Sequence, residues 1–393
     1  MERSEPLAWE LAGWRRGIPL PIGAVPVFGH FANVFFQFMF REHFLNIADQ
    51  DAWERYLPAD RSVFGSLGYA RIYEAFRRCS PRLYVVDSNE AVISYPLLLR
   101  SLKDLPFQVD TKAKWDTTTP NFTGPLMSGS DSKVAAAFPD LRNALFRGEG
   151  IVAEFAHLHP WSQFATILKK DCNYDRDIVW VDTTLSPDDL WRTHLEHACR
   201  KKIKQAERAG VRILTASSDD HIREFYRVYR QTMERNEAEE SYYLSYEFFQ
   251  AFRDELPENA RFVLAEYRDQ IVGVTLCLYD SNDAFTLFGG ADAAFQHVRP
   301  TNAVFWDLIR WAHETGKKRL VLGGGYRLND GIFRFKAAFS RLRQPFLIYK
   351  RVHLERDYAL LEERHRSFSN LNGDGVSYFP AYRCPAKGPQ RET

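Results

Sequence analysis

The sequence predicts an α/β protein with mixed central sheets, flanking helices and more than one domain. At 393 residues the chain is too long for one small core, so two domains are expected. From residue 48 onward, short apolar runs bounded by turn residues alternate with amphipathic segments, which is typical of strands alternating with helices. A clear helix start at Ser186 and Pro187, followed by two aspartates, supports this reading.

Composition indicates a globular protein without a global nucleic-acid signature. The net charge is +1, so any nucleic-acid site must be a local patch. Aromatic content of 15% favours aromatic cores and a cleft for a sizeable ligand. The five cysteines form no C-x-x-C pair, so neither a disulfide framework nor a zinc site is expected, and a reducing cytoplasm fits. There is no signal-peptide pattern and no uncharged apolar run of spanning length.

Four regions are expected along the chain. Residues 1–47 are predicted to be an irregular extension, although periodicity leaves open whether 31–44 form a helix or a strand. Residues 48–176 and 177–351 are predicted to form two α/β domains. In residues 352–393, a helix over 358–365 is expected to pack back on the first domain, and the tail from Cys384 is expected to be disordered.

The first domain is predicted to contain two helices, 64–76 and 138–146, an antiparallel hairpin over 82–100 and a strand over 151–160. Pro96 should end the second hairpin strand or place it at an edge. Asn121 and Gly124 lie in a loop where the glycine lets a substrate approach the backbone. His157 and His159 are two apart on the strand, and a structural role is favoured over metal binding because no further ligand is evident.

The second domain is predicted to begin with a strand and one or two helices that end at Gly210. Further strands are expected over 211–215, 261–267, 271–279, 284–289 and 319–322, and helices over 219–237, 247–254 and 301–316. The helix before Gly210 carries a basic stripe of Arg200, Lys201, Lys204 and Arg208. A solvated face with acidic partners and a phosphate-binding surface are equally compatible with this stripe.

The stretch 319–336 is the strongest candidate for a site. Gly323, Gly324 and Gly325 end a buried strand and let the backbone approach a ligand or another chain closely. After a turn over 328–331, three phenylalanines fall at a strand-like spacing: Phe333, Phe335 and Phe339. Lys336 lies among them, either as an exposed lysine at a strand end or as a cation where negative charge develops in a reaction.

The order strand–turn–strand–turn–strand–helix–strand in the second domain resembles the core of the GNAT acyltransferase fold, and the first domain is compatible with a degraded copy. Seven further stretches stand out, in this order along the chain: 151–160, 200–211, 229–243, 289–291, 309–312, 322–325 and 330–336. Together they resemble the FemX/FemAB-like peptidyltransferases, which are tandem GNAT proteins, and the resemblance spans roughly residues 48–350.

This resemblance implies amide formation, with an aminoacyl group moving from the ester of an aminoacyl-tRNA to a substrate amine. It implies that Lys336 stabilises the tetrahedral oxyanion or holds the terminal adenosine of the donor, and that Phe335 packs on that adenosine. The basic stripe then becomes a candidate tRNA-binding surface. The candidate substrate contacts, on the acceptor side in domain one and the donor side in domain two, are Asn121, Gly124, His159, Arg235, Tyr242, Phe288, Arg299, Asn302, Tyr326, Asp330 and Arg334.

The donor is expected to be aminoacyl-tRNA rather than CoA. Acetyl-CoA-dependent GNAT proteins hold pyrophosphate on a glycine-containing loop at a helix start. The equivalent stretch, 296–302, has no glycine, and Pro300 donates no N–H; Asn302 is as compatible with helix capping as with substrate contact. The acceptor is expected to be an amine-bearing small molecule or cell-wall precursor, and a monomer without metal or organic cofactor is expected. An acyl-CoA-dependent N-acyltransferase and a non-catalytic tRNA-binding relative are the alternatives.

Overall fold

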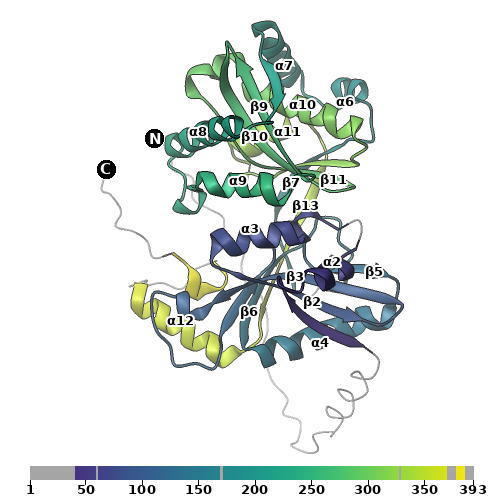
Figure 1. Ribbon diagram of the computed structural model, residues 1–393, viewed down its shortest axis with the longest axis vertical. Helices are drawn as coiled ribbons and strands as arrows, with labels where there is room; N and C mark the ends of the chain where they lie inside the picture. The colour runs from purple at the N-terminus through teal and green to yellow at the C-terminus, as the bar shows by residue number, and fades with distance from the viewer. Residues whose placement is uncertain (1–39, 59–60, 169–170, 327–328, 370–377, 386–393) are drawn as a thin grey trace, which may run out of the picture. The chain divides into compact units, whose positions relative to one another are not determined.

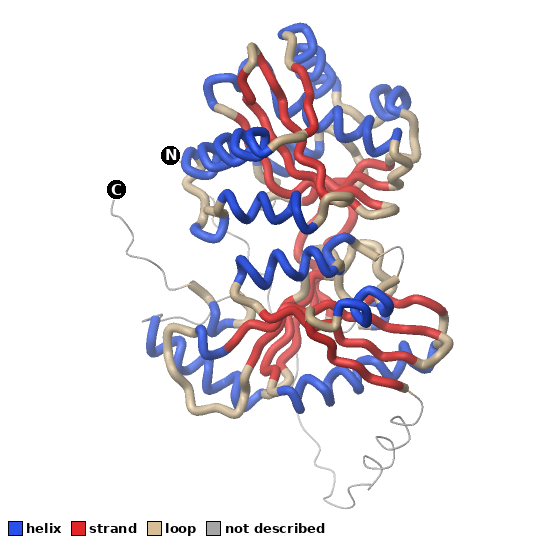
Figure 2. Tube along the Cα trace, in the orientation of Figure 1, coloured by secondary structure: helices blue, strands red, loops and turns tan. Residues whose placement is uncertain are grey.

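The computed structural model describes residues 40–58, 61–168, 171–326, 329–369 and 378–385. Residues 40–393 form one compact unit, and the other unit, 1–39, lies outside the described residues. Strands run between layers of helices (Figure 1; Figure 2, strands red and helices blue). The predicted mixed α/β class is therefore confirmed.

Among the described residues, thirteen strands join in one mixed sheet, in the order β1-β2-β3-β4-β6-β13-β7-β12-β11-β10-β9-β8, with β5 beside β3. Their bounds are β1 (Arg41–Asn46), β2 (Ser80–Asp87), β3 (Ala91–Ser101), β4 (Trp115–Thr118), β5 (Leu126–Gly129), β6 (Ile151–His157), β7 (Cys172–Asp182), β8 (Arg212–Thr215), β9 (Ala260–Tyr267), β10 (Gln270–Tyr279), β11 (Asp283–Ala291), β12 (Arg319–Gly323) and β13 (Arg343–Val352).

The helices carry the capping residues that the sequence offers. Ser186, Ser218 and Ser245 accept backbone N–H bonds at helix starts, and Gly150 and Gly210 end helices in the left-handed conformation. The bounds are α2 (Gln50–Tyr56), α3 (Leu67–Arg77), α4 (Ser132–Glu149), α5 (Phe164–Ile167), α6 (Pro187–Thr193), α7 (His197–Ala209), α8 (Asp219–Arg235), α9 (Tyr246–Glu255), α10 (Pro300–Glu314), α11 (Gly331–Ala337) and α12 (Glu355–Ser369).

The sheet repeats one topology. In what we call the N-terminal half, β1 to β4 pair antiparallel in order and β6 pairs parallel with β4. In the C-terminal half, β8 to β11 pair antiparallel in order and β12 pairs parallel with β11. Two helices follow the first strand of each half, and one long helix, α4 or α10, precedes the parallel strand. The same unit is thus built twice.

The last strand of each unit is exchanged. The chain leaves β6 and forms β7, which pairs with β12 of the C-terminal half. It leaves β12 and forms β13, which pairs with β6 of the N-terminal half, and β7 and β13 pair with each other. The predicted domain boundary at residues 176 and 177 falls inside β7, and the domain limits remain a prediction.

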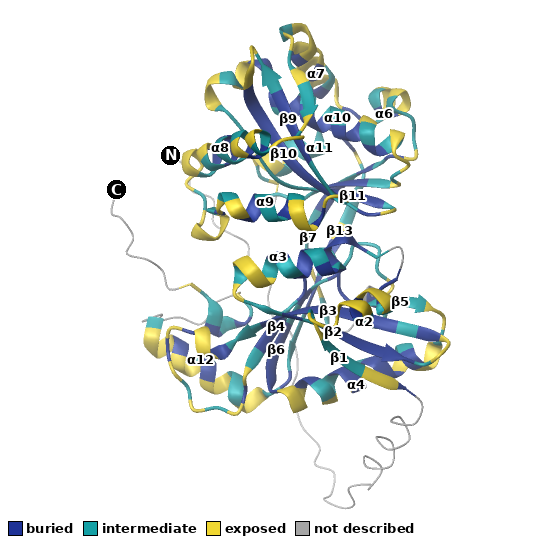
Figure 3. Cartoon of the chain, in the orientation of Figure 1, coloured by how far each residue is buried: buried dark blue, intermediate teal, exposed yellow. Residues whose placement is uncertain are grey.

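Many of the buried residues are aromatic. Figure 3 colours the buried positions along the strands and helices dark blue. One cluster lies between the C-terminal half and helices α3, α8 and α9, and it includes Phe64, Tyr69, Phe249 and Phe285. Tyr69 contacts Phe252 with ring centroids 6.1 Å apart, so α3 of the N-terminal half packs on α9 of the C-terminal half. This core fixes the two halves of residues 40–393 against each other.

Four local expectations need correction. Residues 41–46 of the expected irregular extension form β1. Pro96 lies inside β3 opposite Leu83, at the gap where pairing with β5 ends at Ser94 and pairing with β4 begins at Leu98, so its missing N–H costs little. The predicted helix 64–76 is a 3₁₀ turn followed by α3.

The fourth correction concerns Phe333, Phe335 and Phe339, for which strand spacing was predicted. Gly331–Ala337 is helix α11, capped by Asp330, whose carboxylate accepts the N–H of Phe333 at 2.7 Å. Phe335 and Phe339 are four apart, and their ring centroids lie 5.3 Å apart. Spacings of two and four coexist in this stretch, and the capping aspartate favours the helix.

The expected C-terminal helix is present as α12, which packs on β6 through Leu361. Cys384, predicted to begin the tail, accepts a hydrogen bond at 2.8 Å from His365 through its carbonyl oxygen. The remainder of that predicted tail, 386–393, lies outside the described residues.

Candidate functional site

The site lies where β12 ends in three glycines. Gly323 has φ of +80°, a conformation that favours glycine. A Cβ on Gly324 would meet the Arg176 side chain at 2.8 Å and the Asp177 carbonyl at 3.2 Å. The close approach that the glycines permit is therefore made by strand β7 of the same chain.

Lys336 reaches back from α11 to this turn. Its ammonium donates to the Gly324 carbonyl oxygen at 2.8 Å. Burial lowers the pKa of Lys336 to about 8, with Arg176 adding to the shift and Asp330 opposing it. At neutral pH Lys336 is therefore a largely desolvated cation, and only one of its three donors is engaged by the described residues.

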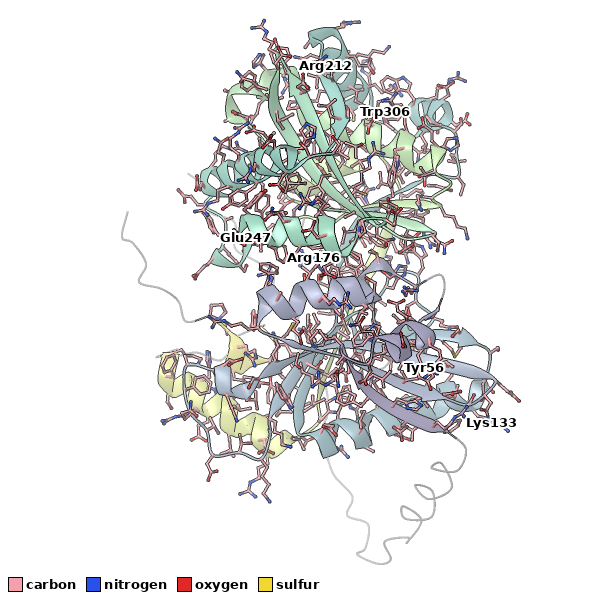
Figure 4. All side chains as sticks on the ribbon, in the orientation of Figure 1. Tyr56, Lys133, Arg176, Arg212, Glu247 and Trp306 are labelled. Carbon is pink, nitrogen blue, oxygen red and sulfur yellow. The ribbon has the colours of Figure 1, made fainter. Side chains whose placement is uncertain are left out.

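Arg176 on β7 (labelled in Figure 4) is a site residue that the sequence did not single out. Its guanidinium donates to the Gly325 carbonyl at 2.7 Å and to the carboxylate of Asp175. The signal was present as a charged run, Asp175 to Asp177, of which only Asp177 belonged to an expected strand. Because β7 reaches the site only through the strand exchange, sequence order alone did not connect it with Lys336.

A pocket of about 110 Å³ opens beside this contact. We call it the β7–α11 pocket; it is lined by Asp175, Arg176, Asp177, Gly325, Tyr326, Asn329 and Phe333. Three predicted residues meet here. Tyr326 lines the pocket, Asp330 caps α11 and accepts the Tyr326 N–H at 2.7 Å, and Arg334 donates to the Asn329 carbonyl at 3.2 Å.

The loop after α8 lies close to this pocket. The Tyr326 hydroxyl donates to the carboxylate of Glu239, another residue that the sequence did not single out. Arg235 donates to the Ala291 carbonyl at 2.9 Å, and Tyr242 is exposed, with its carbonyl accepting from Tyr229 at 2.6 Å. Glu239 thus links the run containing Arg235 and Tyr242 to the site.

Two predicted aromatic contacts lie in cores. Phe335 packs on Phe305, with ring centroids 5.1 Å apart, and on Phe339. Phe288 packs against Phe249 at 5.7 Å. Both rings are partly buried in clusters of hydrophobic residues, so their first role is to hold α11 and β11 in place.

The predicted contacts from the N-terminal half lie elsewhere. A Cβ on Gly124 would meet Leu158 at 2.9 Å, so this glycine admits the segment that follows β6. The Asn121 carbonyl accepts from the hydroxyl of Thr123. His159 lies 3.5 Å from Asp283 at the start of β11, and Asp283 pairs with Arg319 at the start of β12. Since Lys336 lies at the other end of β12, the structure does not bring His159 to it.

Arg299 and Asn302 lie at the start of α10. Arg299 is the N-cap residue with φ of +58° and donates to Gln205 of α7 at 3.3 Å. Asn302 is buried, and its amide contacts the Cys199 sulfur at 3.9 Å. Both therefore join α10 to α7.

Helix α7 carries the predicted basic stripe. Arg200 is structural, because it donates to the carbonyls of Trp191, Arg192 and Leu195 at the end of α6. Three further basic side chains are exposed and form no ion pair with any described residue: Lys201, Lys204 and Arg208. The N–H of Glu196, just before α7, donates to the Ala338 carbonyl just after α11 at 2.9 Å. The basic helix therefore starts beside the Lys336 helix.

The two halves differ at their parallel strands. In the C-terminal half, β11 pairs with β12 only from Asp283 to Phe285 and then continues along β10. In the N-terminal half, pairing with the β6 strand continues past β4, since Thr119 and Thr123 donate to the carbonyls of Phe155 and His157. Within the described residues, the two parallel strands therefore diverge in the C-terminal half (β11 and β12) and stay paired in the N-terminal half.

Neither a metal cluster nor a membrane span is found in the described part of the chain. No group of three His, Cys, Asp or Glu side chains is placed to hold a metal ion. No helix there is long and apolar enough to cross a membrane.

The C-terminal half, which contains Lys336, is similar to a known domain family. Residues 194–337 match the family model described as an acetyltransferase (GNAT) domain. This match and the repeated topology confirm the predicted pair of GNAT-like units.

Solved structures extend the likeness to the longer chain. The crystal structure of FemX matches with a TM-score of 0.61 and 12% identity, covering 81% of this chain and 99% of FemX. A conserved protein of unknown function from Bacteroides thetaiotaomicron VPI-5482 matches with a TM-score of 0.53 and 11% identity, covering 80% and 100%. No curated protein matches the sequence. The chain has the fold of FemX, as predicted.

Proposed function

We propose that this protein is an aminoacyl-tRNA-dependent aminoacyltransferase that forms an amide on the amine of a small molecule or a cell-wall precursor. We further propose that it acts in the cytoplasm as a monomer. The observation that carries the proposal is the desolvated ammonium of Lys336 beside the glycine turn, in the half whose parallel strands separate.

In the proposed reaction, the acceptor nitrogen bonds to the acyl carbon of the tRNA ester and the bond from that carbon to the ribose oxygen breaks. One proton moves from the nitrogen to the ribose oxygen, so that an amide and a free tRNA hydroxyl result. In the tetrahedral intermediate, the former carbonyl oxygen carries the negative charge. A preorganised ammonium in a desolvated place stabilises this charge by roughly 3–4 kcal/mol. Lys336, two of whose donors have no hydrogen-bond partner among the described residues, fits that task.

The start of α10 supports a donor other than CoA. A pyrophosphate needs free backbone N–H groups at a helix start. Here Pro300 has none, and the N–H groups of Asn302 and Ala303 donate to the Arg299 carbonyl at 3.1 and 3.3 Å. Gln205 also donates to the His297 carbonyl at 2.7 Å, which ties this segment to α7.

Helix α7 supports a tRNA donor. Phosphate groups are bound by exposed lysine and arginine side chains that are not already paired. Lys201, Lys204 and Arg208 are exposed and form no ion pair with a described residue, although Lys204 lies over the Trp191 ring; α7 starts beside α11. Its 13 residues span roughly 20 Å, so the acceptor arm can follow the helix while the 3′ end reaches Lys336.

An acyl-CoA-dependent N-acyltransferase is the second candidate, favoured by the match of residues 194–337 to an acetyltransferase model. Filter binding of total charged tRNA across a salt series, with CoA as competitor, separates the two. We expect binding that weakens with salt and is indifferent to CoA. Absence of binding at low salt overturns the tRNA proposal. Binding of charged tRNA without transfer of its amino acid would instead favour the alternative of a non-catalytic tRNA-binding protein.

A further inference from the structure

We infer that the β7–α11 pocket binds a primary ammonium group, with the carboxylate of Asp177 as its hydrogen-bond acceptor. The occupant is the amine end of the acceptor substrate. This identity of the occupant rests on the proposed function, whereas binding of an amine in the pocket does not require it.

The charges in the pocket point to a cationic occupant. Arg176 is already matched by Asp175 and held by the Gly325 carbonyl. Asp177 forms no ion pair with a described residue. Arg343 is a cation on which the charge of Asp177 acts, but its guanidinium donates instead to the carbonyls of Ser340 and Leu342, each at 2.8 Å. The pocket therefore presents a carboxylate without a hydrogen-bonded cation.

The position of Asp177 suits an attacking amine. Its backbone carbonyl lies against Gly324, where an added Cβ would be 3.2 Å away. The carbonyl of the same glycine accepts the bond from Lys336 at 2.8 Å. One residue, Gly324, thus separates the backbone of Asp177 from the ammonium of Lys336. An acceptor that binds here as an ammonium first loses one proton to the Asp177 carboxylate, and the neutral amine that remains then attacks the acyl carbon as in the proposed reaction.

The volume of the pocket and the residues that line it also favour an amine. A volume of about 110 Å³ admits an alkylammonium end and excludes a nucleotide. Tyr326, which lines the pocket, is 51% exposed. Tyr174, which is 56% exposed and does not line the pocket, hydrogen-bonds the Asp177 side chain from outside it. Aromatic faces attract cations, and the Glu239 carboxylate bound to the Tyr326 hydroxyl adds negative charge.

The test is ligand-observed NMR with n-butylamine hydrochloride as probe and n-butanol as its neutral match. We expect saturation transfer to n-butylamine and little to n-butanol. Asp177→Asn, which keeps the shape of the side chain, is expected to weaken n-butylamine binding about tenfold, since a hydrogen bond to a charged group is lost. Asp220→Asn, which removes an acid that is 94% exposed on α8, is the matched control and should bind like the wild type.

Equal signals from amine and alcohol on the wild-type protein overturn the inference without any variant. Unchanged binding in a folded Asp177→Asn protein overturns it as well. Because this assay contains no acyl donor, failure of the tRNA proposal leaves its outcome intact. Conversely, tRNA-dependent transfer combined with no amine binding in the pocket retains the function and rejects this subsite.

Discussion

Lys336 concentrates the chemistry in one side chain. Its ammonium is taken out of water by α11 and by the turn after β12, and a single carbonyl is its hydrogen-bond partner among the described residues. Keeping such a cation out of water destabilises the protein before the reaction, and the cation is stabilised when an oxyanion forms beside it. A residue that only supported the fold would not need to be charged here.

Lys336→Met is expected to lower transfer about 10²–10³-fold while tRNA affinity stays within twofold, because the oxyanion loses its cation and α7 is untouched. The melting temperature should not fall much, since a poorly solvated charge is removed. Single-turnover transfer and filter binding measure the two effects. Loss of both activities together would indicate a misfolded site.

The rate should depend on the protonation of Lys336. Below a pH of about 8 the Lys336 amine is charged. With an acceptor amine whose own pKa lies well below 8, and which therefore stays neutral over the range tested, transfer is expected to decline about tenfold per pH unit above pH 8. The folded pKa is lower than the usual 10.5, so the unfolded chain binds more protons between about 8 and 10.5. Stability should therefore gain from this group as the pH rises through that window. A rate that is flat to pH 10 contradicts the role of the cation.

At the scale of the element, the turn 323–325 joins β12, β7 and α11. Gly324→Ala is expected to destabilise the protein by about 1–3 kcal/mol and to reduce transfer, because its Cβ would displace Arg176 and the Asp177 carbonyl. Gly148→Ala in α4 is the control, since nothing lies within 4 Å of its Cβ. Urea unfolding and transfer rates measure both; equal behaviour of the two variants would contradict the account.

Helix α7 offers a test of the tRNA surface. Replacing Lys201, Lys204 and Arg208 together by glutamine should flatten the slope of log affinity against log salt by about 2–3, one released counterion for each lost contact. Replacing three exposed arginines of α12 serves as control: Arg356, Arg364 and Arg366. If the salt dependence of affinity changes equally in both triple variants, tRNA binding depends on the overall charge of the protein and not on α7.

Elements with strong local signals were predictable. The capped start of α6, the end of α7 at Gly210 and the strands β9 to β12 follow from periodicity and turn residues. The site was predictable only in part. Lys336, Tyr326 and Asp330 are close in sequence, whereas Arg176 and Asp177 reach them through pairing of β7 with β12, which no local pattern encodes. His159 shows the reverse case: family likeness suggested it, and the β12 strand separates it from Lys336.

At the scale of the whole molecule, strand exchange binds the two halves into one folding unit. A buried polar network fixes β13 on the N-terminal half. Tyr349 accepts from Arg142 at 2.6 Å, and His353 lies 2.9 Å from Glu154, which in turn pairs with Arg142 at 3.4 Å. These side chains are buried, so β13 can pack on the N-terminal half only when each of them keeps its hydrogen-bond or ion-pair partner.

Glu154→Leu is expected to destabilise the protein by about 3–5 kcal/mol, because Arg142 remains as a buried, unpaired charge. Both halves should unfold in a single transition. Tryptophan fluorescence measures this in two variants that each keep one tryptophan, Trp53 in the N-terminal half or Trp306 in the C-terminal half. Two separate midpoints would contradict the view that the exchanged strands couple the halves.

The most direct test of the proposed function is transfer of a labelled amino acid from charged tRNA to an amine acceptor, with labelled acetyl-CoA in a parallel reaction. Amides survive mild alkali and tRNA esters do not, so alkali-stable label counts product. We predict alkali-stable label from charged tRNA, lost in Lys336→Met, and none above background from acetyl-CoA. Label that arrives only from acetyl-CoA, while the tRNA ester stays intact, would contradict the proposal.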